Sequence, residues 1–165
     1  MTQAYSGAIF SIGSNLGDRL GALRRASGLL GERAGHVTDK SFVYETPPWG
    51  VTSQPRFLNA CVGARTCLSP RELLCEIKNI ERIMGRAPRE RWGPREIDID
   101  ILLYGDAAVD EPDLKIPHPF MLERAFVLIP LADIFPNMIC PLSRSSAAEL
   151  AEGLPRDGIL RITAL

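Results

Sequence analysis

Apolar positions along the chain predict strands and helices in alternation. Short runs rich in Ile, Val, Phe and Tyr at 4–13, 41–46 and 57–66 have the length and composition of β-strands. Segments 18–33 and 69–85 instead repeat apolar residues every three or four positions, which is the spacing of one helix face. The first half of the chain therefore predicts strand, helix, strand, strand, helix.

The second of these helices has a complete start signal. Ser69 can cap it, Pro70 suits the first helical position, and Glu72 completes a capping box. The segment after it, 86–96, is rich in arginine and contains glycine and proline, which predicts a loop.

The second half of the chain predicts a strand within 91–105, a turn at Gly105 and Asp106, and a short strand at 107–109. The run 123–135 predicts a helix that breaks near Pro130, because proline removes a helical hydrogen bond. A last strand is predicted within 158–163.

This order predicts an α+β fold: a ferredoxin-like antiparallel sheet with helices packed on one face and the other face free. With no linker, repeat or low-complexity tract, the 165 residues are predicted to form a single domain, 1–165.

Composition narrows the function classes. The net charge of −1 gives no electrostatic case for nucleic acid or an anionic membrane, and no apolar run approaches the ~20 residues that span a bilayer. The N-terminus shows no signal peptide. Four cysteines without a CxxC pair are expected to be buried or partly buried thiols of a reducing compartment. We therefore expect a cytoplasmic protein.

The strand within 91–105 carries two carboxylates on one face. Asp98 and Asp100 alternate with Ile97, Ile99 and Ile101, so the aspartates share one face, and the isoleucines share the core face with Leu103. The pair fits either an acidic solvent face or a site for a hard divalent cation such as Mg²⁺, which prefers oxygen ligands.

The neighbouring arginines favour the metal interpretation. Arg86, Arg91 and Arg95 precede or flank the aspartates, and planar guanidinium groups suit phosphate oxygens. Taken singly, such arginines also fit a solvated loop, but Trp92 among them must pack on something. No GxxxxGK[ST] phosphate loop occurs, and GSNLG at 13–17 fits a turn and helix start better than a phosphate loop.

Two further places could bind a ligand. Phe57 and Asn59 are two residues apart on a strand and share a face. They could bind a flat heteroaromatic ring, or they could be an edge-strand pair that the proline-rich loop at 47–55 covers. His118 lies between prolines and is held stiffly, as a packed residue or a phosphate contact.

Five ordered motifs, FSIGSNLGD, YETPPWG, QPRFLNA, RWGPREIDIDILLYG and IPHPFMLERAFVLIPLADI, resemble the 6-hydroxymethyl-7,8-dihydropterin pyrophosphokinase family over residues 4–134. The resemblance implies a three-layer α/β/α form of the ferredoxin-like fold with extra C-terminal elements. It also implies transfer of pyrophosphate from ATP to a reduced pterin in folate biosynthesis, giving AMP, by an ATP-dependent diphosphotransferase with two Mg²⁺ ions. The expected partners are these small-molecule substrates, and the expected state is a monomer.

The resemblance also implies roles for individual residues. The catalytic group would be Arg86, Arg95, Asp98 and Asp100, with both aspartates as metal ligands. The residues expected to bind ATP are Glu81, Arg86, Trp92, Arg95, Ile99, Lys115, His118 and Arg124. The residues expected to bind the pterin are Thr46, Pro47, Trp49, Phe57, Asn59, Trp92, Asp98 and Phe126.

The chain differs from the family pattern at a few places. The arginine loop is one residue shorter between Arg86 and Trp92. Lys78 stands where a glutamine is usual, and Asp113 where a basic residue is usual, with Lys115 nearby.

Three other functions fit part of the pattern: an RNA-binding module on the same fold, a non-catalytic relative, and a kinase that forms ADP. The carboxylates on the sheet face disfavour the first, and the combined aspartates, arginines and histidine disfavour the second. Residue chemistry alone does not separate the third from pyrophosphoryl transfer.

Overall fold

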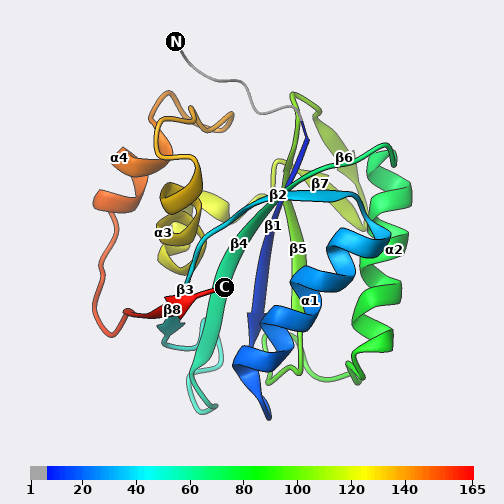
Figure 1. The fold of residues 1–165 in the computed structure, drawn as a ribbon. Coiled ribbons are helices and arrows are strands. Elements are labelled where there is room, and N and C mark those ends of the chain that lie inside the picture. The colour runs from blue at the N-terminus through cyan, green and yellow to red at the C-terminus, as the bar shows by residue number, and fades with distance from the viewer. Residues whose placement is uncertain (1–6) are drawn as a thin grey trace.

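The computed structural model describes residues 7–165, so the predicted strand residues 4–6 lie outside the described part. Its centre is an antiparallel sheet with the strand order β5-β1-β4-β3-β8, in which β2 also pairs with β4 (Figure 1). The strands are β1 (Ala8–Ser14), β2 (His36–Lys40), β3 (Phe42–Thr46), β4 (Phe57–Arg65), β5 (Asp98–Tyr104) and β8 (Leu160–Ala164). The α+β, ferredoxin-like fold predicted from the sequence is confirmed.

Two helices cover one face of the sheet. Helix α1 (Arg19–Arg33) begins after Asp18, whose side chain accepts a hydrogen bond from the Gly21 amide. Helix α2 (Pro70–Ile83) begins at the predicted capping box between Ser69 and Glu72. Their apolar stripes bury Leu23, Leu30, Ile77 and Ile80 against the sheet, and this core includes Phe10, Ile12 and Leu58.

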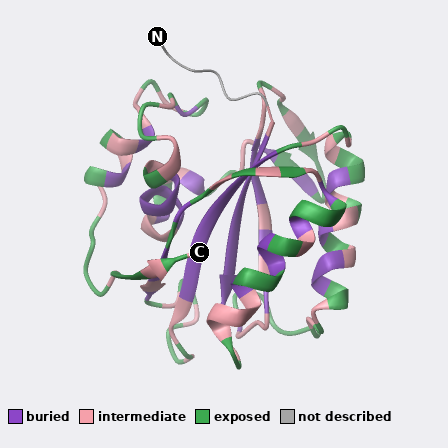
Figure 2. Ribbon diagram, in the orientation of Figure 1, coloured by how far each residue is buried: buried purple, intermediate pink, exposed green. Residues whose placement is uncertain are grey.

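The opposite face is not left free as expected, because the C-terminal elements cover part of it. Helices α3 (Ala125–Ile134) and α4 (Ala147–Glu152) pack there, after the short 3₁₀ helix η1 (Met121–Glu123). A second core joins Leu128 and Leu131 of α3 to Ile9, Cys61 and Leu102 of the sheet. The sheet is thus buried between two helical layers, whose outer surfaces are exposed (Figure 2).

The predicted break at Pro130 is wrong, because the residue lies inside a continuous α3. Proline removes only one backbone donor, and burial of Val127, Leu128, Ile129 and Leu131 around it stabilises the helix.

Strands β2 and β7, the 3₁₀ helix η1 and helix α4 were not predicted from the sequence. Strand β2, which is polar except for Val37, alternates exposed and half-buried residues and is held by pairing with β4. Strands β6 (Val109–Glu111) and β7 (Leu114–Ile116) form a separate two-stranded hairpin, so the strand predicted at 107–109 begins later. Helix α4 is only six residues long.

Alternation along β5 holds only as far as Ile101. Ile97, Ile99 and Ile101 face the α1–α2 core as predicted, but Leu103 joins the core beneath α3 together with Leu102. The cause is a register irregularity in β5: Ile9 pairs with Leu103 and the next residue, Phe10, pairs with Ile101, so Leu102 is an extra residue in β5. Asp98 and Asp100 lie before this irregularity and keep their common face.

The four cysteines are free thiols. Cys61 and Cys140 are buried, but Cys67 and Cys75 are exposed, so the expectation of buried or partly buried thiols is wrong for these two. Cys75 lies on α2 between Leu73 and Ile77, which face the sheet, and therefore points toward solvent. Among residues 7–165 no helix is both long and apolar enough to cross a bilayer.

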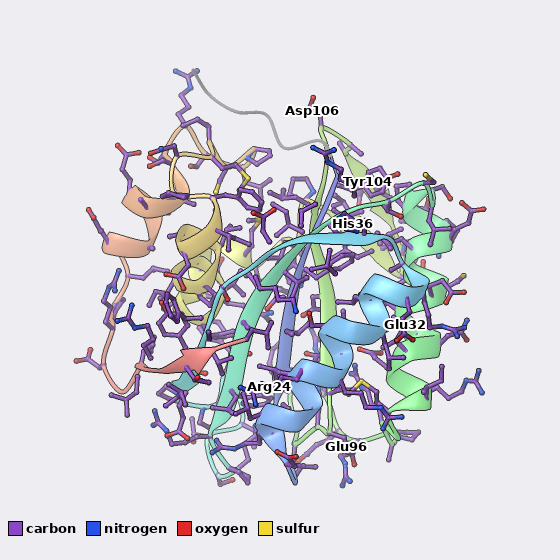
Figure 3. The ribbon with its side chains drawn as sticks, viewed as in Figure 1. Arg24, Glu32, His36, Glu96, Tyr104 and Asp106 are labelled. Atoms are coloured by element: carbon purple, nitrogen blue, oxygen red, sulfur yellow. The ribbon has the colours of Figure 1, made fainter. Side chains whose placement is uncertain are left out.

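Charged side chains of α1 that point away from the sheet, such as Arg24 and Glu32, are on the surface of the molecule (Figure 3). Asp98 and Asp100, in the first half of β5, instead face a pocket.

Candidate active site

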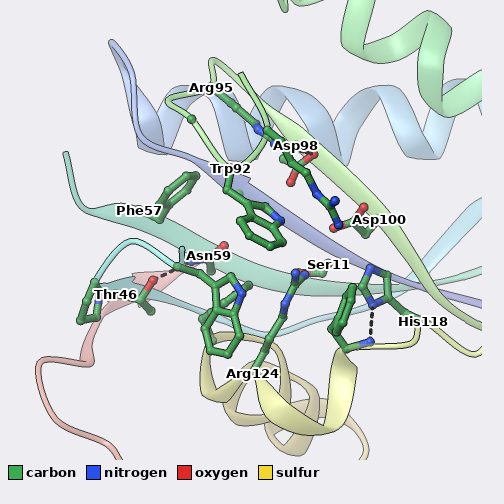
Figure 4. A pocket seen from close by; sticks show the side chains of 17 residues that line it. Ser11, Thr46, Phe57, Asn59, Trp92, Arg95, Asp98, Asp100, His118 and Arg124 are labelled. Atoms are coloured by element: carbon green, nitrogen blue, oxygen red, sulfur yellow. Dashed lines mark hydrogen bonds and ion pairs between the residues drawn. The ribbon is translucent and has the colours of Figure 1, made fainter. Parts of the chain in front are cut away.

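A pocket opens where the sheet is not covered by α3 (Figure 4). Its floor is formed by β1, β4 and β5, and its rim by the loop before β4, the arginine-rich loop before β5 and the start of α3. The residues that line it are Ser11, Gly13, Thr46, Pro47, Trp49, Phe57, Asn59, Arg91, Trp92, Gly93, Arg95, Asp98, Asp100, His118, Phe120, Arg124 and Phe126.

The two aspartates of β5 have different surroundings. Asp98 accepts from Arg86 Nη1 at 2.9 Å and pairs with Arg95 Nη1 at 3.1 Å. None of the ion pairs among residues 7–165 includes Asp100. Burial, and then the adjacent Asp98 charge, raise the pKa of Asp100 to about 7. Two arginines therefore compensate the charge of Asp98, whereas Asp100 has no ion-pair partner among the described residues.

This donor set fits a hard divalent cation. The described residues contain no group of three or more His, Cys, Asp and Glu side chains that could form a protein-only metal cage. Mg²⁺, however, commonly binds through one or two carboxylates and completes its shell with water and substrate phosphates. Asp98 and Asp100, side by side on one pocket wall, offer that arrangement.

Arg86 and Glu81 form a buried support behind the aspartates. The Glu81 side chain is 5% exposed and contacts both Arg86 Nη1 and, at 3.2 Å, Lys78 Nζ. It also accepts from the backbone N–H of Ile99 at 3.0 Å, which fixes β5 between the two aspartates. Neither Glu81 nor Arg86 is among the residues that line this pocket.

Aromatic and amide groups occupy the other side of the pocket. Phe57 and Asn59 share a face of β4 as predicted, and Asn59 Nδ2 donates to Thr46 Oγ1 at 2.7 Å. Gly13 is needed beside them, because a Cβ atom there would lie 2.5 Å from Asn59 Oδ1. Trp49 meets Phe126 edge-on, with ring centroids 6.1 Å apart.

Arg124 reaches between these two sides, toward the middle of the pocket (Figure 4). Its guanidinium carbon lies 5.6 Å from the centre of the Trp49 ring, and 5.2 Å and 5.5 Å from the ring centres of Phe120 and Phe126. Burial lowers the pKa of Arg124, and the Asp100 carboxylate opposes this effect. The Nε atom of Arg124 is buried without a hydrogen-bond partner, so the side chain has an unused donor.

His118 stands at the junction with a second pocket. Its Nδ1 accepts from the Phe120 amide at 3.2 Å, and burial together with the Arg124 charge lowers its pKa to about 4. The imidazole is therefore neutral at neutral pH. The second pocket lies between α2, β5 and the β6–β7 hairpin, shares Asp100 and His118 with the first, and is lined by Leu74, Lys78, Ile99, Asp100, Ile101, Pro112, Asp113, Leu114, Lys115, His118 and Pro119.

Two loops over the first pocket touch each other. Gln54 Nε2, in the loop before β4, donates to the backbone oxygen of Trp92 at 2.7 Å. Gly50 lies against the Trp92 ring. Arg91 stacks on the same ring, with 4.5 Å between its guanidinium carbon and the ring centre. Trp92 has a φ of 61°, an uncommon value for a residue with a side chain.

The structure brings most of the predicted site residues together. The first pocket contains Thr46, Pro47, Trp49, Phe57, Asn59, Trp92, Arg95, Asp98, Asp100, His118, Arg124 and Phe126, and the second contains Ile99 and Lys115. Sequence reasoning missed Ser11 and Gly13, whose signal was their alternation on β1, and Phe120, which had none. It also missed the hydrogen bonds of Asn15 and Gln54.

Comparison with known proteins agrees with this geometry. Residues 9–136 match the family described as 7,8-dihydro-6-hydroxymethylpterin-pyrophosphokinase (HPPK). A 2-amino-4-hydroxy-6-hydroxymethyldihydropteridine pyrophosphokinase of Aquifex aeolicus is 46% identical over 138 residues, 84% of this chain and 86% of the relative. The protein of the same name from Methylorubrum extorquens is 44% identical over 163 residues, 98% of this chain and 99% of the relative.

Solved structures share the fold at low identity. A crystal structure of Plasmodium falciparum HPPK-DHPS with pterin and p-hydroxybenzoate superimposes with a TM-score of 0.71 at 17% identity. The match covers 92% of this chain but only 42% of that one, so this chain spans less than half of that protein.

Proposed function

The chain belongs to the 7,8-dihydro-6-hydroxymethylpterin-pyrophosphokinase family, and on this premise we propose that it transfers pyrophosphate from ATP to 6-hydroxymethyl-7,8-dihydropterin in folate biosynthesis. The observation that carries the proposal is one pocket in which Asp98 and Asp100 face Phe57, Asn59 and Phe126. A flat ring and a charged phosphate chain can meet there.

The pterin is proposed to bind on the aromatic side. Phe57 and Phe126 would stack on the ring, since aromatic pairs favour offset or edge contacts. Asn59, already oriented by Thr46, would hydrogen-bond the polar edge of the ring with its carbonyl oxygen. Trp49 beside Phe126, and Pro47, would close this side against water.

ATP is proposed to bind across both pockets. Its nucleoside would lie in the second pocket, between Ile99 of β5 and Lys115 of the hairpin. Its phosphates would then pass Asp100 and His118, which both pockets share, and reach Arg95 and Arg124. The unused donor of Arg124 supports this path, because a phosphate oxygen could accept from it.

Asp98 and Asp100 would hold the Mg²⁺ ions. When bound, Mg²⁺ neutralises phosphate oxygens and makes the attacking alcohol more acidic. The protein's own contribution is to align the groups, exclude water and neutralise charge with Arg95 and Arg124.

The proposed step is a substitution at the β-phosphorus of ATP. The pterin hydroxymethyl oxygen forms a bond to the β-phosphorus of ATP, and the bond from that phosphorus to the α,β-bridging oxygen breaks. AMP leaves with the bridging oxygen, and the hydroxyl proton passes to solvent. Few bonds to protein are required, as in other phosphoryl transfers.

The test is product analysis with ATP, Mg²⁺ and 6-hydroxymethyl-7,8-dihydropterin. AMP formed in equal amount with the pterin diphosphate supports the proposal. ADP would instead show transfer of a single phosphoryl group, and absence of pterin-dependent turnover would show a protein that only binds. We also propose that the protein is a monomer. We further propose that it works in the cytoplasm, and the four free thiols support this reducing compartment.

A further inference from the structure

The GSNLG segment has no part in the proposed chemistry, yet it contains a buried polar side chain. Asn15 follows the last residue of β1 and is only 2% exposed. A buried amide is costly unless its donors and acceptor are all used.

All polar atoms of the Asn15 side chain are used, and by segments far away in the chain. Nδ2 donates to Gln54 Oε1 and to the Pro55 carbonyl, each at 2.9 Å. Oδ1 accepts from the Arg95 backbone N–H at 2.8 Å, and the Asn15 N–H donates to the Arg95 carbonyl at 3.1 Å. Asn15 thus ties the end of β1 to both loops over the pocket.

Gln54 extends the connection to the second loop. Its Nε2 donates to the Val51 carbonyl at 2.6 Å and to the Trp92 carbonyl at 2.7 Å. The side-chain amides of Asn15 and Gln54 therefore have all their hydrogen-bond partners. Together they form a chain of hydrogen bonds from Arg95 through Asn15 and Gln54 to Trp92.

We propose that Asn15 is a positioning residue for the reaction. It fixes the backbone of Arg95, whose guanidinium pairs with Asp98 at 3.1 Å, and through Gln54 it holds the Trp92 loop over the pocket. The inference rests on the proposed function, because Arg95 matters to catalysis only if phosphate charge develops beside it.

The direction of the hydrogen bonds explains why an amide is needed. A carboxylate at residue 15 would place an acceptor against two acceptors, Gln54 Oε1 and the Pro55 carbonyl. Gln54 could donate to that carboxylate only by turning its amide, and its oxygen would then face the Trp92 carbonyl. Asn15→Asp, of nearly the same size, should therefore release the Trp92 loop.

The experiment compares wild type, Asn15→Asp and Gln54→Ala in steady-state kinetics and in acrylamide quenching of tryptophan fluorescence. Trp49 and Trp92 are the chain's two tryptophans, and both line the pocket. Thr66→Val is the matched control, because Thr66 Oγ1 also bridges loops, donating to Ala34 O at 2.5 Å and accepting from Leu68 N at 3.1 Å, but at the opposite end of β4.

We expect Asn15→Asp to lower kcat by about 100-fold, with KM for both substrates changed by less than about threefold, since misplaced catalytic groups slow chemistry at this scale. Quenching should increase in Asn15→Asp and Gln54→Ala, and kcat should fall less in Gln54→Ala because Arg95 stays anchored. Thr66→Val should change neither.

Two results would overturn the inference: an active wild type with unchanged kcat in Asn15→Asp, or a kcat loss equal to that of Thr66→Val. If Asn15→Asp does not fold, Gln54→Ala decides, and unchanged quenching and kcat there would also overturn it. An inactive wild type would contradict the proposed function instead, and quenching would still test the network.

Discussion

Arg86 Nη1 lies 2.9 Å from the Asp98 carboxylate, and the same nitrogen contacts the buried carboxylate of Glu81. Burial alone would lower the pKa of Arg86, but the Asp98 and Glu81 carboxylates outweigh it and raise the pKa, so Arg86 keeps its positive charge. In the free protein this arginine therefore neutralises a carboxylate that the proposed reaction needs for Mg²⁺.

The Arg86→Ala variant should show both how Arg86 competes with the metal ion for Asp98 and how much Arg86 contributes to turnover. We expect Mn²⁺, used in place of Mg²⁺, to bind the nucleotide-free protein a few times more tightly, because Asp98 loses a competing cation. We expect kcat to fall by about 100-fold, because the Asp98 carboxylate loses the contact that fixes its position. Electron paramagnetic resonance of free Mn²⁺ gives the first value. Weaker Mn²⁺ binding in Arg86→Ala would contradict the competition.

Asp100→Asn should abolish Mg²⁺-dependent turnover and yet stabilise the metal-free protein at pH 8. The pKa of Asp100 is raised to about 7 from 3.8, so its contribution to stability is present at low pH and is lost as pH rises toward 7. One pKa unit corresponds to about 1.4 kcal/mol and the pKa rises from 3.8 to about 7, so the gain at pH 8 should be at most about 4 kcal/mol. Urea unfolding in EDTA at pH 5 and pH 8 measures it, and a variant less stable than wild type at pH 8 refutes it.

His118 should give stability the opposite dependence on pH. Its pKa is lowered to about 4 from 6.5, so the unfolded chain takes up a proton first, and stability is lost as pH falls from about 6.5 to 4. His118→Asn, which keeps an acceptor for the Phe120 amide, should reduce this loss by about 1–3 kcal/mol. Unfolding free energies at pH 5 and pH 7 test this, and equal losses in variant and wild type would disprove the assignment.

Phe126→Ala should weaken pterin binding and leave nucleotide binding nearly unchanged. Stacking on an aromatic side chain contributes about 1–3 kcal/mol per ring, which corresponds to about 10- to 100-fold in affinity. Calorimetry with the pterin and with a non-hydrolysable ATP analogue measures both. Phe42→Ala, an exposed aromatic on β3, serves as the control, and a nucleotide-specific defect in Phe126→Ala would mean that the pockets are exchanged.

Prediction of the fold succeeded where local signals agree with tertiary packing. The Ser69–Glu72 capping box determines where α2 begins, and its apolar stripe determines which face is buried. Strand β2 shows the opposite case, because residues 36–40 are polar except for Val37, lie at the sheet edge and become a strand only through pairing with β4. Leu103 was placed in the wrong core because β5 has an extra residue, Leu102, in its pairing with β1, and the apolar run at 101–103 gives no local signal for it.

In the site too, the sequence predicted neighbours along one strand but not partners that are distant in the chain. Period-two alternation put Asp98 beside Asp100 and Phe57 beside Asn59, because both pairs lie on regular strands. The connections of Asn15 escaped, since its partners Gln54 and Arg95 are 39 and 80 residues away. Likewise, no local pattern shows that Arg86 turns back to Glu81 instead of lining the pocket.

The contact between Gly13 and Asn59 has a consequence for inhibitor design. A side chain at residue 13 would collide with the Asn59 amide oxygen, 2.5 Å from the added carbon, so substitution there would disturb the group proposed to recognise the pterin. A compound that rests on the Gly13 backbone therefore touches a surface that the protein has little freedom to alter. A substitution at Gly13 that blocked such a compound would therefore also weaken binding of the proposed pterin substrate.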